Sequence, residues 1–205
     1  SNNTQNQGDP GQWRLKRALA GGGALPDIGI YCLNTIRYLL GEEPIKVTGT
    51  VYSTPNDPRF KEVDETVLFQ LQFPSGVLAQ CSTSYGVHDS QWYRCYADKG
   101  GYFGLDPAFA YKGLQIDGSQ VQEEMEVKLK SSAGEKNQFA LEMDHMALCV
   151  VNDKKPFTPG EEGLQDHIIM EAIYESAKTG KPVALKKIDK LDAFRGTPPD
   201  DLKIA

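Results

Sequence analysis

The spacing of apolar residues predicts a helix near the start of the chain. Between Ala24 and Leu40 apolar side chains recur every three or four positions. Pro26 suits the first turn of a helix, because it has no backbone N–H to leave unpaired. Asp27 is favourable beside the positive end of the helix dipole. Gly41 follows the last periodic residue, which is the position where helices commonly end.

Two faces of this predicted helix differ in character. Ile28, Cys32, Ile36 and Leu39 form an apolar stripe that we expect to pack against the rest of the protein. Asp27, Tyr31, Asn34 and Tyr38 recur at the same spacing and form a polar face.

After this helix the spacing of apolar residues changes to one that is typical of β-strands. Runs rich in Val, Thr, Tyr and Phe alternate with turn-forming residues, which favours successive antiparallel strands. Pro74-Ser75-Gly76 predicts a tight hairpin, and Asp117-Gly118 predicts a turn between the last two strands. The expected strands cover residues 45–54, 65–73, 77–85, 92–97, 102–105, 111–115 and 121–129.

Helical spacing returns after the strands, over residues 138–152 and 164–179, with Gly180 as the predicted end of the second helix. Strands grouped together and helices grouped before and after them indicate the α+β class. We therefore expect a largely antiparallel open sheet with helices packed on one face. A doubly wound domain would instead alternate strands and helices along the chain.

Composition excludes several classes of protein and partner. The 205 residues hold 28 acidic and 22 basic side chains, for a net charge of -6, with no basic stripe, so nucleic acid is not an expected partner. No apolar run is long enough for a membrane-spanning helix, and no membrane partner is expected. The four cysteines are widely spaced, which favours free thiols over a disulfide framework or zinc finger.

Motifs for nucleotide and metal binding are missing from the sequence. It has no GxGxxG turn after a strand and no phosphate-binding lysine loop. Glu142 and His145 share a helix face and make half of a possible metal site, but no second ligand cluster accompanies them. We expect no metal.

The polar face formed by Asp27, Tyr31 and Asn34 is the clearest chemical feature. Groups four residues apart on a helix lie roughly 6 Å apart along one face, so a carboxylate and a phenol there can address one small polyol. A phenol with a pKa near about 10 exchanges protons poorly at neutral pH unless a cation lowers that pKa. A solvated face of an ordinary helix explains the same residues equally well.

The sequence also resembles a known family. The glycine-rich approach to the helix, the Asp-x-Gly-x-Tyr pattern at 27–31 and the closing segment resemble the C-terminal domain of the Gfo/Idh/MocA oxidoreductases, most of all the glucose-fructose oxidoreductase branch. The resemblance extends over about residues 11–187. It rests on Trp13–Leu15, Ala20–Asn34, Arg37–Pro44, Asp57–Phe60, Asp98–Gly100, Asp106–Phe109, Gly160–Asp166 and Glu171–Val183.

This resemblance implies a role in hydride transfer between a nicotinamide and a sugar or polyol. Family members bind NAD or NADP mainly through an N-terminal Rossmann domain, and they form homodimers or larger homo-oligomers through the sheet face. By motif, Tyr31 would exchange the substrate proton and Asp27 would orient the substrate hydroxyl. Trp13 and Arg14 would lie against the cofactor. The fragment alone would be inactive, since the Rossmann domain and its lysine are not within it.

Four further residues are weaker candidates for substrate binding: Asn34, Arg59, Lys112 and His167. Exposed loop and helix residues of these types are more commonly just solvated. The alternative function is a non-catalytic module for carbohydrate binding or assembly on the same fold.

The ends of the chain carry weaker expectations. Residues 1–10 are expected to be a lead-in that begins with a remnant of tag cleavage, residues 11–187 the substrate-binding and dimerisation domain, and residues 188–205 a tail. A cytoplasmic location is the first expectation and the periplasm the alternative. Substrate identity, the choice of cofactor and reaction direction stay open.

Overall fold

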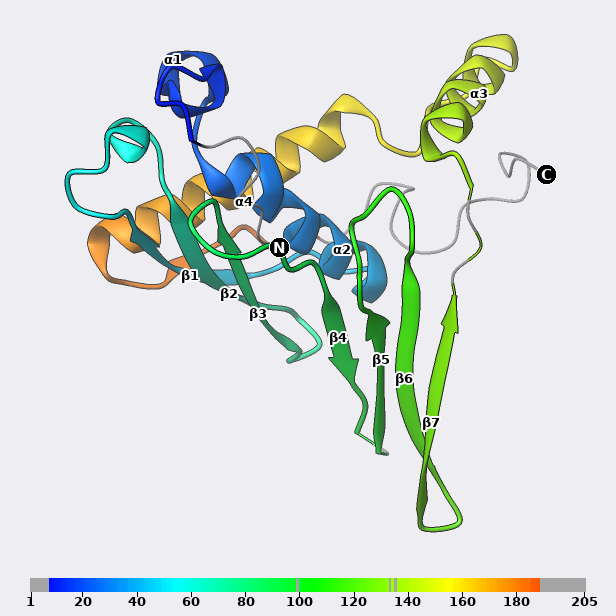
Figure 1. Ribbon diagram of the computed structural model, residues 1–205. Helices are drawn as coiled ribbons and strands as arrows, with labels where there is room; N and C mark the ends of the chain where they lie inside the picture. The colour runs from blue at the N-terminus through cyan, green and yellow to red at the C-terminus, as the bar shows by residue number, and fades with distance from the viewer. Residues whose placement is uncertain (1–7, 99, 133, 135, 189–205) are drawn as a thin grey trace. The chain divides into compact units, whose positions relative to one another are not determined.

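The computed structural model describes residues 8–188 except 99, 133 and 135, and Figure 1 shows the course of the chain. Ser90–Asp144 forms one compact unit, and the remaining described residues form another. The predicted tail over 188–205 lies outside the described residues, apart from its first position, as does most of the lead-in over 1–10.

The larger unit begins with two short helical segments that the sequence analysis does not predict, followed by the helix that it does. A short 3-10 turn, Trp13–Leu15, precedes α1, Arg17–Ala20, and the glycine run follows. The predicted helix is present in two parts: a π-helical turn, Leu25–Gly29, runs directly into α2, Ile30–Leu40. Gly41 ends it with φ 64°, and its N–H donates to the carbonyl of Arg37.

One four-stranded antiparallel sheet belongs to this unit, in the order β3-β2-β1-β8. Its strands are β1, Lys46–Tyr52, β2, Thr66–Gln72, β3, Leu78–Ser84, and the two-residue β8, Val183–Ala184. The predicted hairpin at Pro74-Ser75-Gly76 is confirmed. Phe73 and Val77 close it with a 3.0 Å backbone hydrogen bond, and Gly76 has φ 90°. Of these four strands, β8 alone lacks a sequence-based prediction, because two residues are too few to show a period.

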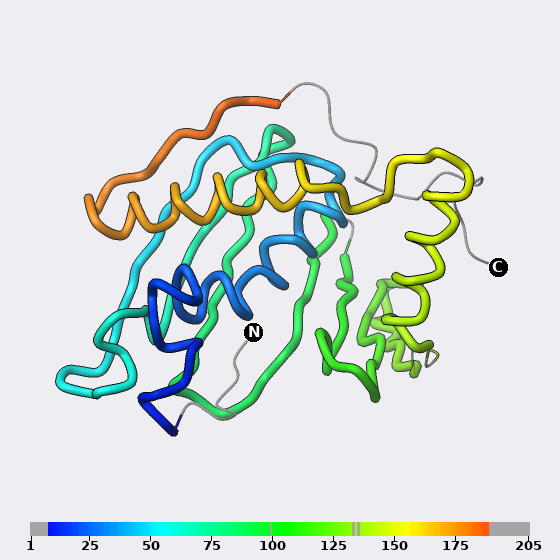
Figure 2. Tube along the Cα trace, turned by 90° about the horizontal axis from the view of Figure 1, so that it is seen from above, coloured from blue at the N-terminus to red at the C-terminus, as the bar shows by residue number. Residues whose placement is uncertain are grey.

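Helices α2 and α4, Gly160–Thr179, cover one face of this sheet, as Figure 2 shows along the chain trace. Val47, Phe69 and Leu71 on the strands and Leu33 and Ile173 on the helices are all 2% exposed or less. These side chains meet because alternate strand residues face the helices. The helix packing holds the beginning of α2 against the end of β3.

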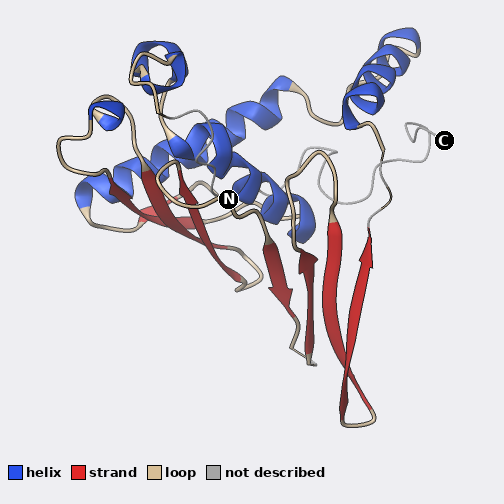
Figure 3. Ribbon diagram, in the orientation of Figure 1, coloured by secondary structure: helices blue, strands red, loops and turns tan. Residues whose placement is uncertain are grey.

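The smaller unit contains a second antiparallel sheet, in the order β4-β5-β6-β7, drawn among the red strands of Figure 3. Its strands are β4, Tyr93–Tyr96, β5, Gly101–Leu105, β6, Gln115–Gln122, and β7, Met125–Ser132. The α+β class is confirmed, although the described strands form two sheets instead of one continuous open sheet. Helix α3, Gln138–Val151, lies where the sequence predicts it.

The predicted turn at Asp117-Gly118 is wrong, and so is the predicted strand over 111–115. Both turn residues lie inside β6, where Asp117 pairs with Lys130 and Gly118 with Leu129. The chain reverses instead at Glu123 and Glu124, which have φ 49° and 65°. The pairing of three strands over their full length outweighs the local turn preference of an Asp-Gly pair.

The faces of the second sheet differ in polarity. Residues paired directly across strands share a face, so one face carries the apolar side chains of Phe103, Leu105, Ile116, Met125, Val127 and Leu129. The opposite face carries Arg94, Asp117, Glu126, Lys128 and Lys130. Several apolar side chains are substantially exposed, including Phe103 at 51% and Leu129 at 55%.

Within residues 8–98, 100–132 and 136–188, no helix combines the length and hydrophobicity needed to cross a membrane. All four cysteines are free, as expected, although only Cys149 is buried.

Candidate functional site

Asp64 holds the beginning of the long helix in place. Its carboxylate accepts hydrogen bonds from the backbone N–H groups of Gly23, over 2.9 Å, and Leu25, over 3.1 Å. Its own carbonyl accepts from the N–H of Ala24, and the phenol of Tyr174 donates to its carboxylate over 2.6 Å. Helix N-termini leave such N–H groups without partners, and a carboxylate satisfies them. The loop before β2 therefore fixes where the helix starts.

The glycine run is explained by this contact. A Cβ atom on Gly23 would lie 2.0 Å from the carbonyl oxygen of Asp64, and a Cβ atom on Gly22 would lie 2.8 Å from the phenol oxygen of Tyr174. Gly21 adopts φ 77° at the end of α1. Only residues without a side chain permit this close approach.

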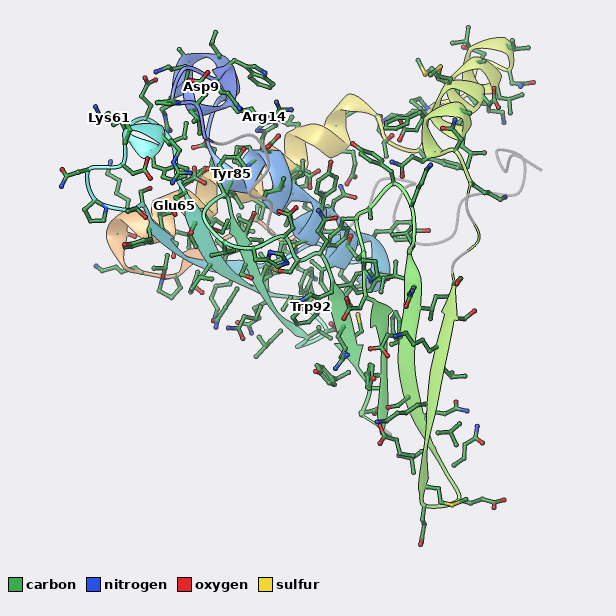
Figure 4. All side chains as sticks on the ribbon, viewed as in Figure 1. Asp9, Arg14, Lys61, Glu65, Tyr85 and Trp92 are labelled. Carbon is green, nitrogen blue, oxygen red and sulfur yellow. The ribbon has the colours of Figure 1, made fainter. Side chains whose placement is uncertain are left out.

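The carboxylate of Asp27 lies in the π-helical turn and is held by two side chains. Oδ2 accepts a 2.7 Å hydrogen bond from the phenol of Tyr85, and Nε of Arg14 lies 3.5 Å from the same oxygen. In Figure 4 Tyr85 and Arg14 are labelled on the same side of the larger unit. Tyr85 directly follows β3 and is 1% exposed, whereas the side chain of Asp27 is 34% exposed.

The surroundings of Tyr85 keep its phenol protonated. Burial raises its pKa above the ordinary value, and the hydrogen bond to Asp27 and the negative charges of Asp27 and Asp64 raise it further. Arg14 opposes this shift with its positive charge. Tyr85 is therefore a permanent hydrogen-bond donor to Asp27, and its phenol is unsuited to accept or lose protons.

Arg14 also contacts the aromatic ring before it. Its guanidinium carbon lies 4.5 Å from the ring centroid of Trp13, a cation–π distance. Trp13 is 52% exposed, so the rest of the indole is open to solvent. The structure thus brings Trp13, Arg14 and Asp27 together through direct contacts.

Tyr31 and Asn34 follow on α2 but have different surroundings. Tyr31 lies in the first turn of α2 and is 47% exposed. Asn34 donates a 3.0 Å hydrogen bond to Oδ2 of Asp166, a 3% exposed carboxylate that also pairs with Arg37. Tyr31 is therefore accessible to a small molecule, while the amide of Asn34 belongs to an interior polar cluster.

Three of the weaker candidates have surroundings of their own. Arg59 is held by Asp57, whose carboxylate accepts from the Arg59 backbone and guanidinium at the short turn Pro58–Phe60. His167 lies on the exposed side of α4. Lys112 is an exposed residue of the smaller unit.

A comparison with known protein families identifies the family of the chain. The profile described as "Oxidoreductase family, C-terminal alpha/beta domain" of Gfo/Idh/MocA proteins matches residues 1–185. This chain belongs to the Gfo/Idh/MocA oxidoreductase family. The resemblance that the sequence motifs indicate is confirmed.

Several members of the Gfo/Idh/MocA family are similar to the chain over most of its length. D-xylose 1-dehydrogenase [NADP(+)] of Haloarcula marismortui is 36% identical over 183 residues, which is 86% of this chain and 48% of the relative. 1,5-anhydro-D-fructose reductase of Ensifer adhaerens is 24% identical, over 85% of this chain and 51% of the relative. The chain spans about half the length of these relatives.

Solved structures of the family agree with the fold. Aldose-aldose oxidoreductase from Caulobacter crescentus, complexed with glycerol, is 43% identical and superposes with a TM-score of 0.78, covering 87% of this chain and 52% of that chain. A levoglucosan dehydrogenase complex with NADH and L-sorbose, at 18% identity and a TM-score of 0.75, shares the fold over 91% of this chain and 57% of its own.

Sequence reasoning missed Tyr85 in this Gfo/Idh/MocA domain. It follows β3, 58 positions after Asp27, and no motif links the two residues. One signal could have placed it. Alternate residues of a strand share a face, so Tyr85 continues the row of Ala79, Cys81 and Thr83 that faces the helices.

His145, which the sequence analysis considered with Glu142 as half of a possible metal site, instead contacts Phe157. Its Nε2 accepts a 3.0 Å hydrogen bond from the N–H of Phe157, and the two rings stack with centroids 4.2 Å apart. Among the described residues, no group of three potential metal ligands comes together.

Proposed function

We propose that this chain is the substrate-binding and dimerisation domain of an NAD(P)-dependent oxidoreductase that transfers hydride between a nicotinamide and a sugar or polyol carbon. The observation that carries the proposal is the carboxylate of Asp27, held by Tyr85 and Arg14, with the exposed Tyr31 one helical turn later. The printed names of the relatives support it, since they include a D-xylose dehydrogenase and an aldose-aldose oxidoreductase.

Asp27 is suited to orient a substrate hydroxyl. Both contacts to its carboxylate involve Oδ2, and among the described residues none donates a hydrogen bond to Oδ1. Oδ1 therefore accepts the hydrogen of one substrate hydroxyl in our proposal. A fixed acceptor places the sugar in one orientation and so lowers the entropic part of the barrier.

Tyr31 is the proposed proton carrier. When a carbinol carbon loses hydride, the proton of its hydroxyl must also leave. The phenol oxygen of Tyr31 exchanges that proton, for which the phenol needs a nearby cation to reach a suitable pKa. We assign that cation to a lysine of the Rossmann domain that the family resemblance implies.

The cofactor is the group that receives or supplies the hydride, and the residues at 13 and 14 fit its nicotinamide end. The exposed indole of Trp13 offers a flat apolar face, and the guanidinium of Arg14 offers hydrogen-bond donors beside it. The sequence has no GxGxxG turn after a strand, the motif that binds dinucleotide phosphates. We therefore propose that the Rossmann domain holds most of the NAD or NADP, and that this domain alone is inactive.

The dimerisation role rests on the second sheet. Phe103, Ile116 and Leu129 share one face of it and are 44–55% exposed. Exposed apolar sheet faces of this kind mark interaction surfaces. We propose that this face packs against the same face of a second copy around a twofold axis.

The function is tested with the full-length protein and a panel of aldoses and polyols, by following reduction of NAD or NADP. Tyr31→Phe should lower turnover by two or more orders of magnitude, because the phenol oxygen is the proton carrier. Tyr38→Phe is the matched control, since Tyr38 lies on the same helix and is 44% exposed against 47% for Tyr31. Full activity of the Tyr31 variant would disprove the assignment, and a wild-type protein inactive on every sugar would favour a non-catalytic module.

A further inference from the structure

We infer that Tyr85 is a positioning residue for the reaction: its phenol fixes the carboxylate of Asp27 so that the second oxygen is presented to the substrate. This inference rests on the proposed function, because it gives Asp27 the task of orienting a substrate hydroxyl. Tyr85 itself is too deeply buried to touch the substrate, at 1% exposed.

The position of Tyr85 is set independently of Asp27. Its backbone N–H donates a 2.9 Å hydrogen bond to the carbonyl of Glu65, which continues the pairing of β2 and β3 by one residue. Its ring packs in a buried apolar cluster with Leu15, Ala24 and Ile28. A phenol anchored by a strand and a core cluster can impose its geometry on a partner that is less firmly held.

Asp27 is such a partner. One third of its side chain is exposed, and its other contact, to Nε of Arg14 at 3.5 Å, is an ion pair between side chains 34% and 42% exposed. Exposed ion pairs contribute little and hold no single geometry. The 2.7 Å hydrogen bond from Tyr85 is short and charge-assisted, so it selects the orientation of the carboxylate.

The phenol is also a dependable donor. Its hydrogen atom has two acceptors within reach, Oδ2 of Asp27 at 2.7 Å and the carbonyl of Gly23 at 3.3 Å. Both acceptors lie at the helix start, and the charged and nearer one is favoured. Oδ2 is therefore occupied by Tyr85, and the substrate is left with Oδ1.

Tyr174 provides an internal control for this inference. Its phenol donates a hydrogen bond of 2.6 Å to the carboxylate of Asp64, compared with 2.7 Å for Tyr85 and Asp27. Burial raises the pKa of both phenols. The carboxylate of Asp64 also accepts hydrogen bonds from two backbone N–H groups at the helix start. The hydrogen bond from Tyr174 therefore supports the structure and does not orient a substrate-binding carboxylate.

The experiment compares Tyr85→Phe and Tyr174→Phe in the full-length protein, with a wild type that oxidises a sugar. Loss of one positioning hydrogen bond should lower kcat/KM for Tyr85→Phe about tenfold, while NAD or NADP affinity stays unchanged. Tyr174→Phe should keep kcat/KM within about twofold of wild type, although it removes a bond of the same kind. Thermal unfolding of both variants monitors general loss of structure.

A double-mutant cycle with Asp27→Asn separates positioning from a structural role. If Tyr85 acts through Asp27, adding Tyr85→Phe to Asp27→Asn should cost little further activity. Equal losses from the two tyrosine variants, or additive losses in the cycle, would overturn the inference while leaving the proposed function intact. A wild type without activity on any sugar would instead remove the proposed function, and with it the task assigned to Tyr85.

Discussion

Arg37 and Glu43 form a two-pronged ion pair in the interior, with Nε and Nη2 of the arginine each 2.8 Å from a carboxylate oxygen. Arg37 is fully buried, and its guanidinium also pairs with Glu162 and Asp166 on α4. Burial works to lower the pKa of Arg37, but the hydrogen bond to Glu43 and the surrounding carboxylates raise it overall. One cation therefore joins α2 to α4 behind the helix face that carries Tyr31.

Removal of this cation should destabilise the protein strongly. Arg37→Met leaves the carboxylates of Glu43, Glu162 and Asp166 buried without their partner, which should lower the free energy of unfolding by about 3–5 kcal/mol. Chemical denaturation measures the loss. Arg94→Met is the control, because Arg94 pairs with Asp117 at the surface and its side chain is 33% exposed. A loss for Arg37→Met as small as that for Arg94→Met would contradict the structural role.

The glycine before the helix should also be sensitive to substitution, although less than the buried arginine. Gly23→Ala places a Cβ atom 2.0 Å from the carbonyl of Asp64, so the helix start must move, at a cost of about 1–3 kcal/mol. Gly163→Ala makes the same chemical change on the exposed side of α4, where nothing lies within 4 Å. That variant should gain about 0.5–1 kcal/mol from helix propensity. Thermal unfolding should show a lower melting temperature for Gly23→Ala and a higher one for Gly163→Ala. A rise in melting temperature for both variants would mean that the helix start accommodates the added methyl group.

Local signals explain what the sequence predicted well. Gly41, Gly76 and Gly180 end their helices or turns in conformations that depend only on the residue itself and its immediate neighbours. The motif that carries Trp13, Arg14, Asp27 and Tyr31 is also nearly contiguous. The contacts of Arg14 with Trp13 and with Asp27 follow from one short stretch of chain.

Contacts across long stretches explain what the sequence could not reveal. Asp64 and Tyr85 reach the helix start from positions 41 and 58 residues away from their partners. Of the apolar stripe expected on Ile28, Cys32, Ile36 and Leu39, Ile28 is buried and Cys32 and Ile36 pack against the core, as predicted. The most deeply buried positions of α2 are instead Leu33 and Arg37, which are both 0% exposed. An arginine can occupy the centre of a buried helix face only because Glu162 and Asp166 come from α4 to neutralise it.

Alkaline pH should destabilise the protein through its two buried phenols. The pKa values of Tyr85 and Tyr174 are raised above the ordinary 10 in the folded state, mainly by burial. Their contribution to stability is fully present below pH 10 and is lost as pH rises above it, because the unfolded state then releases protons that the folded state retains. The slope reaches about 1.4 kcal/mol per pH unit for each phenol.

Denaturation curves between neutral pH and the alkaline range, measured on wild type and Tyr174→Phe, test this linkage. The variant lacks one of the two phenols, so its free energy of unfolding should fall less steeply above pH 10. Tyr38→Phe removes a 44% exposed phenol and should leave the slope of wild type unchanged. Parallel curves for all three proteins would show that the phenol of Tyr174 does not retain its proton above pH 10.

Assembly through the second sheet gives the last prediction. Leu129 and Lys128 are neighbours on β7 with side chains on opposite faces, and Leu129 shares its face with Phe103 and Ile116. In a twofold interface both copies contribute residue 129, so a lysine there would bury two positive charges in an apolar contact. Burying a charge without a partner is costly. Leu129→Lys should therefore convert a dimer into monomers at micromolar concentration, as measured by light scattering.

Lys128→Glu supplies the matched control for assembly, because it changes charge at the adjacent position on the polar face and should leave the dimer intact. Activity assays on the Leu129 variant add a second comparison, since Asp27 and Tyr31 belong to the other unit. A Leu129→Lys protein that remains dimeric would place the interface elsewhere. A monomeric wild type would overturn the proposed dimerisation and leave the apolar face to another partner.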